Sequence, residues 1–99
     1  MTEMSPQPDR SASGDLTVRA SQIGTSLDDL LLHCRTELSR AVEAKQYVRA
    51  NLLRTRVNRL GGLRLDLREA LVAIRRDPDA AAGALDHLAQ EIKEIGEAH

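Results

Sequence analysis

Aromatic residues are almost absent from this sequence, which contains one tyrosine and no phenylalanine or tryptophan. Its hydrophobic residues, 41% of the chain, are therefore mainly aliphatic. Small and branched aliphatic side chains interdigitate well between neighbouring helices. A β-sandwich would need more aromatic and β-branched residues. The composition thus predicts an all-α protein.

The sequence also lacks any long apolar run and has only one cysteine. No stretch approaches the roughly 18 apolar residues of a membrane span, and the first residues lack the order of a signal peptide. A single thiol cannot form an internal disulfide. We therefore expect a soluble protein of the cytoplasm, with no membrane partner. At 99 residues it holds one domain at most, and so small a domain exposes much apolar surface unless a partner covers it.

Residues 1–22 are polar and rich in turn formers, and they show no helical period. We expect a disordered tail there, followed by a single helical domain over residues 23–99. The first helix is expected over about 26–45, with Ser26 and Asp29 as a capping box. Its apolar residues recur at spacings of four and three, as one helix face requires: Leu27, Leu31, Cys34, Leu38 and Ala41.

The strongest periodic signal predicts one long helix over residues 47–76. A heptad repeat of Leu53, Leu60, Leu67 and Ile74 has Ala50, Val57 and Leu71 in its companion core position, with Arg64 as the one break. The repeat keeps its phase through Gly61-Gly62, although each glycine costs a helix about 1 kcal/mol relative to alanine. The alternative is that these glycines end one helix and begin a turn. The predicted interaction and core seam is Leu53, Val57, Leu60, Leu67, Leu71 and Ile74.

Asp77-Pro78 should end that helix, because proline is poorly tolerated inside a helix but suits the first turn of the next, with Asp77 as its cap. The third helix is expected over about 78–97, and its apolar face is Ala81, Leu85, Leu88, Ile92 and Ile95. Between the first two helices, residues 44–47 contain neither glycine nor proline. The change of phase there fits a tight hairpin and also a stutter in a single rod. The predicted fold is a three-helix antiparallel bundle or an extended helical hairpin, with coiled-coil-like packing.

Charge is segregated along the chain, although the net charge is only −1. Residues 1–44 are net −3, residues 45–76 are net +7 and residues 77–99 are net −5. Many arginines of the basic stretch fall at the e and g positions that flank the seam. Two such helices in parallel would face arginine with arginine, so we expect this helix to pair with the acidic first and third helices, of its own chain or of a neighbour. The candidate basic surface is Arg49, Arg54, Arg56, Arg59, Arg68, Arg75 and Arg76.

No arrangement of residues predicts catalysis, a metal site or a cofactor. His33 and Cys34 are adjacent, but neighbours on a helix point about 100° apart and cannot easily share a ligand. A structural zinc site needs four organised ligands, and the two other histidines lie far along the chain. We interpret Cys34 as a small buried hydrophobe, and Asp28-Asp29 as acids favoured by the dipole of a helix first turn.

Residues 34–60 carry a skeleton of Leu38, Ala41, Tyr47, Ala50, Leu53, Arg54, Val57 and Leu60. This skeleton resembles the UVR motif, the helical hairpin of bacterial excision-repair proteins and some protease adaptors. That family usually has acids beside the aromatic and after the arginine, where this chain has Gln46, Val48 and Thr55. The resemblance implies that Tyr47 begins the second helix and that the hairpin docks on a similar hairpin of a partner.

The predicted function is a non-catalytic helical protein–protein interaction module: an adaptor, a regulator or an assembly subunit. Self-association is also predicted, because a second helix of about 45 Å should extend beyond its shorter neighbours and leave part of its seam uncovered. The competing hypothesis is a nucleic-acid-binding regulator that uses the basic helix 45–76. The net negative charge and the shortage of aromatic stacking residues count against it.

Overall fold

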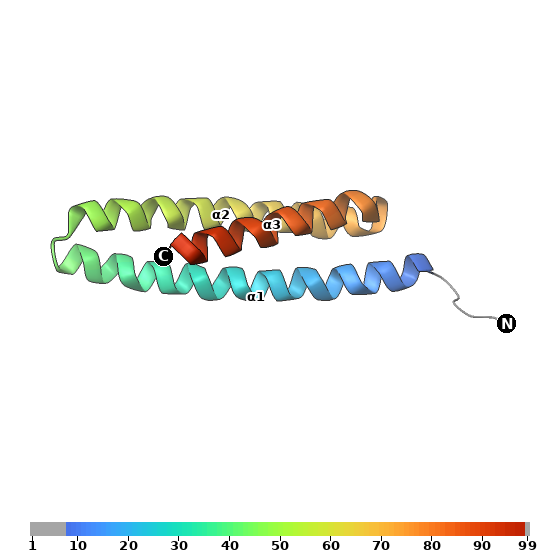
Figure 1. Cartoon of the computed structure of the whole chain (residues 1–99), viewed down its shortest axis with the longest axis horizontal. Coiled ribbons are helices and arrows are strands. Elements are labelled where there is room, and N and C mark those ends of the chain that lie inside the picture. Colours follow the sequence, from blue (N-terminus) through green and yellow to red (C-terminus); the bar gives the residue numbers. More distant parts are fainter. Residues whose placement is uncertain (1–7, 99) are drawn as a thin grey trace.

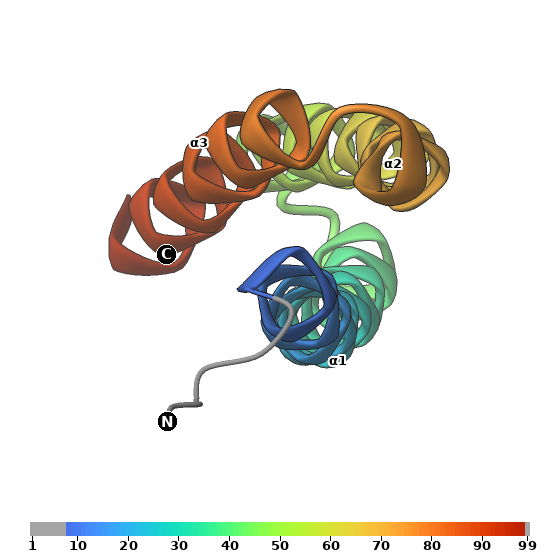
Figure 2. The ribbon, with the colours of Figure 1, turned by 90° about the vertical axis from the view of Figure 1, so that its right-hand side faces the viewer.

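The computed structural model describes residues 8–98, and the side chains of residues 14–97. Three helices follow one another along the chain: α1 (Pro8–Glu43), α2 (Tyr47–Arg76) and α3 (Pro78–Ala98). α1 and α2 form an antiparallel hairpin, and α3 folds back along both of them (Figure 1). In the end-on view, α3 crosses the hairpin obliquely (Figure 2). No strand occurs in the described part of the chain, so the predicted all-α bundle is confirmed.

The first helix begins much earlier than the sequence pattern predicted. Residues 8–22 are helical, so the tail predicted over residues 1–22 is wrong for that stretch. Residues 1–7 lie outside the described part of the chain. Ser26 and Asp29 lie in mid-helix, and the predicted capping box at Ser26 is therefore also wrong.

The early start of α1 has a tertiary cause. Leu16, Ala20 and Ile23 are buried in the same hydrophobic core as the apolar face of α3. Arg19 of α1 also forms an ion pair with Asp86 of α3. Burial of an amphipathic face supplies most of a helix's stability in a protein. These contacts therefore extend α1 through a stretch whose local sequence is rich in serine and threonine.

A tight turn over residues 44–46 joins α1 to α2. The junction is therefore a hairpin, and the alternative of a stutter in a single rod is wrong. The backbone N–H of Gln46 donates to the carbonyl of Ala41 at 2.8 Å, and that of Lys45 donates to Val42 at 3.1 Å. This pair of bonds defines a Schellman motif, which normally has glycine at its left-handed position. Here Lys45 occupies that position, with φ of 60°.

Replacing Lys45 by glycine is expected to stabilise the fold by about 0.5 to 1 kcal/mol. A Cβ makes the left-handed region sterically unfavourable. Glycine has no Cβ and avoids this steric cost, and its greater conformational entropy in the unfolded state offsets only part of the gain. Urea denaturation measures the change. Lys45→Ala is the matched control, because it removes the same charge but keeps the Cβ. Equal stabilisation by alanine and glycine would contradict the strain argument.

Helix α2 runs unbroken through Gly61-Gly62, and neither glycine has a positive φ. The predicted continuous helix is confirmed. Asp77 separates α2 from α3, and its carboxylate accepts a hydrogen bond from the backbone N–H of Ala80 at 3.2 Å. Pro78 is the first residue of α3, so the predicted boundary and cap are both confirmed.

The core has a large part where three helices meet and a small part at the hairpin end. All five residues of the predicted α3 face are buried in the large part, together with Leu27, Leu31 and Cys34 of α1. The small part is a separate cluster of Ala41, Ala50 and Leu53, with Leu38 partly buried beside it. The hairpin end is therefore held together by two helices and few large side chains.

Helix lengths explain this division. α2 has 30 residues and α3 has 21, so α3 is shorter by about 13 Å at 1.5 Å per residue. The hairpin end projects beyond the C-terminal end of α3 (Figure 1). The expectation that both neighbours of α2 are shorter is wrong for α1, which has 36 residues.

Candidate protein-interaction surface

The predicted seam of α2 is mostly used inside the chain. Leu53, Leu60, Leu67 and Ile74 are buried, and Val57 is partly buried against the main core. Leu71 is 45% exposed, so its assignment to the seam is wrong. Leu63 and Ala70 are buried in its place. The seam therefore forms part of the hydrophobic core of the chain, and a surface that docks a partner must lie elsewhere.

The exchange of Leu71 for Ala70 follows from the position of α3. A groove between α2 and α3 is lined by the small side chains Ala70, Ala73, Ala80 and Ala84. Packing on a second helix turns the buried face of α2 toward α3, which buries Ala70 and leaves Leu71 beside α1. The heptad pattern assumes a single partner helix, and this half of α2 has two.

Ion pairs join the basic α2 to its acidic neighbours α1 and α3 within the chain, which is one of the two arrangements that the charge segregation predicted. Arg49 donates to Glu37 of α1 at 2.9 Å, and Arg59 pairs with Glu91 of α3. Arg64 lies 3.6 Å from Asp28 of α1. The arginines of these pairs are about half exposed, whereas the carboxylates of Glu37 and Glu91 are 19% and 21% exposed. Water screens ion pairs of this kind, so each contributes modest stability. Their main effect is to favour this arrangement of helices over a pairing of α2 with itself.

Hydrogen bonds from Arg49 and Arg40 hold the pKa of the Glu37 carboxyl below its usual value. A lowered pKa in the folded state stabilises the protein at pH values above the unfolded-state pKa. That stabilisation is lost as the pH falls through the folded-state pKa. Glu37 is thus a source of acid sensitivity at the hairpin end.

Replacing Glu37 by glutamine is accordingly expected to lower the melting temperature at neutral pH and to have no effect in strong acid. Thermal unfolding of both proteins across an acid-to-neutral pH series measures this. Glu43→Gln, the same charge change in the same helix, is the control and should show no such convergence. A difference between the Glu37→Gln variant and the unaltered protein that persists in strong acid would contradict the ion-pair explanation.

The remaining residues of the candidate basic surface are divided between the two halves of α2. Arg54 donates to Asn51 of its own helix at 3.0 Å, and Arg56 is partly buried. Arg68, Arg75 and Arg76 are exposed near the other end of α2. These last three form no ion pair with the residues that the structure describes.

A distinct apolar surface lies at the hairpin end, where α3 does not reach. Val48 is 79% exposed and Leu52 is 57% exposed. At 3.6 residues per turn, residues 18 apart on a helix point in the same direction. Val48 and Leu52 therefore point in the same directions as Asp66 and Ala70, respectively. Those two residues line the groove against α3. They lie on the α3-covered face of α2, beyond the point at which α3 ends.

We call this surface the open α2 face and define it as Val48, Leu52 and Thr55. Thr55 points like Ala73, another residue of the α3 groove. Its hydroxyl donates to the carbonyl of Asn51 at 3.0 Å, so this hydroxyl is already satisfied within its own helix. The face therefore presents two large apolar side chains, those of Val48 and Leu52.

Cys34 and His33 do not form a metal or nucleophile pair. Cys34 is fully buried and His33 is exposed. Burial raises the pKa of the Cys34 thiol, and the nearby Arg56 guanidinium lowers it by less. No group of three metal-binding side chains occurs among the described residues. The interpretation of Cys34 as a core residue is confirmed.

The Cys34 thiol is expected to react with Ellman's reagent far more slowly in the folded chain than in urea. Only the thiolate attacks, and both burial and the raised pKa suppress it. The rate of absorbance increase measures the reaction. A native rate equal to that in denaturant would contradict the burial of this side chain.

The adjacent acids Asp28 and Asp29 do not lie in a helix first turn, because α1 begins twenty residues earlier at Pro8. The helix-dipole explanation for them is wrong. Asp28 instead faces α2, near Arg64. Asp29 is exposed on the surface of α1.

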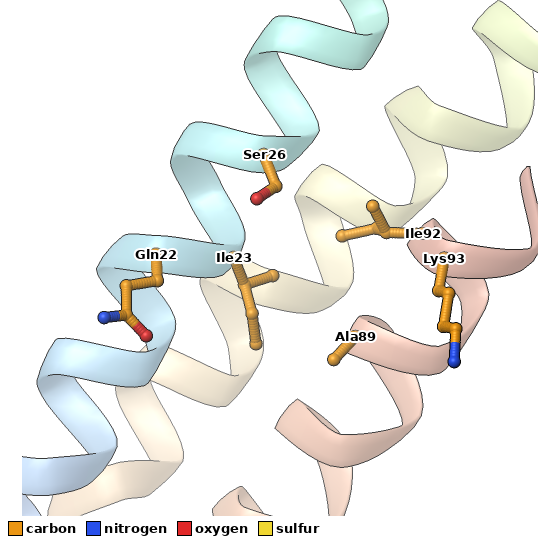
Figure 3. Close-up of a pocket in the computed structure, with 6 residues that line it drawn as sticks. All are labelled: Gln22, Ile23, Ser26, Ala89, Ile92 and Lys93. Atoms are coloured by element: carbon orange, nitrogen blue, oxygen red, sulfur yellow. The ribbon is translucent and has the colours of Figure 1, made fainter. Parts of the chain in front are cut away.

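A second hollow lies between α1 and α3, where Ile23 and Ile92 point toward each other (Figure 3). Ala89 lines it from α3, and its polar lining residues are Gln22, Ser26 and Lys93. Both isoleucines belong to the main core. This hollow is the seam between two packed helices, and we assign no chemistry to it.

Comparison with protein-family models, with curated protein sequences and with solved structures found no match. Tyr47 is the first residue of α2, at the place that the UVR resemblance implies. The relationship itself stays a prediction. Over the residues described, no helix has the length of apolar sequence that a membrane crossing needs.

The predicted site residues did not include Val48 or Leu52. Both lie outside the heptad core positions, so the heptad pattern does not identify them. Their spacing of four residues places them on one helix face, and that is the signal in the sequence. Only the position at which α3 ends shows that this face is open.

Proposed function

We propose that this chain is a non-catalytic helical protein–protein interaction module that docks a partner on the open α2 face. The observation that carries the proposal is the placement of Val48 and Leu52. They continue a face that α3 covers further along, and they are exposed because α3 ends. An amphipathic helix laid in a groove between helices is a common mode of recognition.

The packing at the hairpin end supports this proposal. The core there contains only Ala41, Ala50 and Leu53, with Leu38 partly buried. Burying apolar surface contributes about 25 cal/mol per Å². A partner helix would therefore stabilise the end of the hairpin where the chain supplies least core of its own. The proposal places the protein in the cytoplasm, where a free thiol such as that of Cys34 stays reduced.

Affinity capture from the source cell tests the docking surface when paired variants are compared. In the test variant, Val48→Asp and Leu52→Asp place two charges on the open α2 face. In the matched control, Leu65→Asp and Val72→Asp place two charges elsewhere on α2, at residues that are 61% and 57% exposed. We expect a partner that is lost with the test variant and retained with the control. A set of captured proteins that is the same for both variants would contradict the proposal.

A second candidate function, nucleic-acid binding, draws support from Arg68, Arg75 and Arg76. They are exposed and form no ion pair within the described residues. Binding to phosphates releases counterions, so it weakens steeply as salt rises. Retention on heparin that falls between low and physiological salt would favour this function. An absence of retention at low salt would exclude it.

A further inference from the structure

We infer that the open α2 face receives an acidic amphipathic helix of a partner protein, laid in line with α3. This inference rests on the proposed function and names the chemistry of the partner. It is drawn from the charge of the hairpin end and from the helix that covers the same face further along.

The hairpin end is basic. Residues 37–56 contain five basic and two acidic residues, net +3, and the stretch 45–56 contains no acid. One of the two acids, Glu37, is already bound by Arg40 and Arg49. Charge complementarity selects partners and orients them on approach. An acidic partner therefore fits this end, and a basic one does not.

Helix α3 shows what this face of α2 accepts. Its apolar residues form one buried stripe, and it contains five acidic residues and one lysine. Glu91 of α3 pairs with Arg59 of α2. Arg59 comes seven residues after Leu52, about two helical turns along the same side. A partner helix of the same character would meet Val48 and Leu52 with its apolar stripe, and its acids would complement the net positive charge of the hairpin end.

A second copy of this chain fits the face less well. Two hairpin ends brought together would each carry net +3, and like charges in contact are unfavourable. The acidic α3 of a second copy is not available either, since Leu85 and Leu88 are buried against their own hairpin. The charge pattern therefore favours a different protein as the occupant.

A peptide titration tests the inference. The probe is a fluorescent peptide with the sequence of residues 78–98, and its control has the five carboxylates replaced by amides. Fluorescence anisotropy follows binding to the full chain, to the Val48→Asp/Leu52→Asp variant and to the Leu65→Asp/Val72→Asp control. We expect the acidic peptide to bind at least ten times more tightly than the amide peptide. We also expect at least tenfold weaker binding to the open-face variant, and no change for the control.

Equal binding of the two peptides, or equal binding to the two variants, would overturn the inference. So would binding of neither peptide, and in that case capture of a protein that depends on Val48 and Leu52 would still support the proposed function. Light scattering of the chain alone adds an independent outcome. A dimer that the open-face variant dissociates would show that a second copy is the occupant. Duplex DNA that binds the chain but not this variant would likewise overturn the inference.

Discussion

Replacing Leu60 by alanine is expected to lower the free energy of unfolding by about 2 to 5 kcal/mol. Leu60 has no exposed surface and lies in the main core where three helices meet. The smaller side chain removes buried methyl groups and leaves a cavity in a densely packed interior. Urea denaturation monitored by circular dichroism measures the loss.

Leu65→Ala is the control for this prediction, because the same substitution is made little more than one turn away at a side chain that is 61% exposed. It should change stability by less than about 0.5 kcal/mol. A loss below that value for Leu60→Ala, or similar losses at the two positions, would mean that the helical register of α2 is wrong.

The double replacement of Gly61 and Gly62 by alanine is expected to stabilise the fold by about 2 kcal/mol. Each glycine weakens a helix interior by roughly 1 kcal/mol relative to alanine. Apart from the adjacent residues and backbone of α2 itself, a Cβ added at either position meets no atom within 4 Å, and neither residue has a positive φ. A higher melting temperature with unchanged helix content is the expected result.

Destabilisation with altered helix content would contradict the continuous α2. Destabilisation with unchanged helix content would instead indicate that a neighbouring backbone approaches the glycines, which the open space around them excludes within this chain. The two glycines therefore lower the stability of the middle of α2, and no packing contact within the chain requires them there.

The helices themselves could be predicted from the sequence because their apolar spacing is a local property. The stripe of α3 and the boundary at Asp77-Pro78 are read directly from residues that neighbour each other in the chain. The start of α1 could not be predicted in this way. Leu16 and Ala20 are buried through contacts with a helix more than 55 residues later, and their neighbours in sequence resemble a flexible segment.

The heptad pattern assigned Leu71 to the core because it lies fourteen residues after Val57, in the same companion core position. Ala70 is buried instead, since the small side chains of α3 approach α2 closely there. The open α2 face could not be predicted from the sequence for the same reason, because it depends on the position of α3. Val48 is exposed only because α3 ends before reaching it, and the end of one helix relative to another is set by tertiary packing.

Site-specific photo-crosslinking in the source cell tests the docking surface most directly. A benzoylphenylalanine placed at Val48 lies on the open α2 face, and one placed at Leu65 lies on an exposed part of α2 outside it. The proposed function predicts a covalent adduct of defined mass from position 48 and none of that mass from position 65. The same adduct from both positions, or an adduct from position 65 alone, would contradict it.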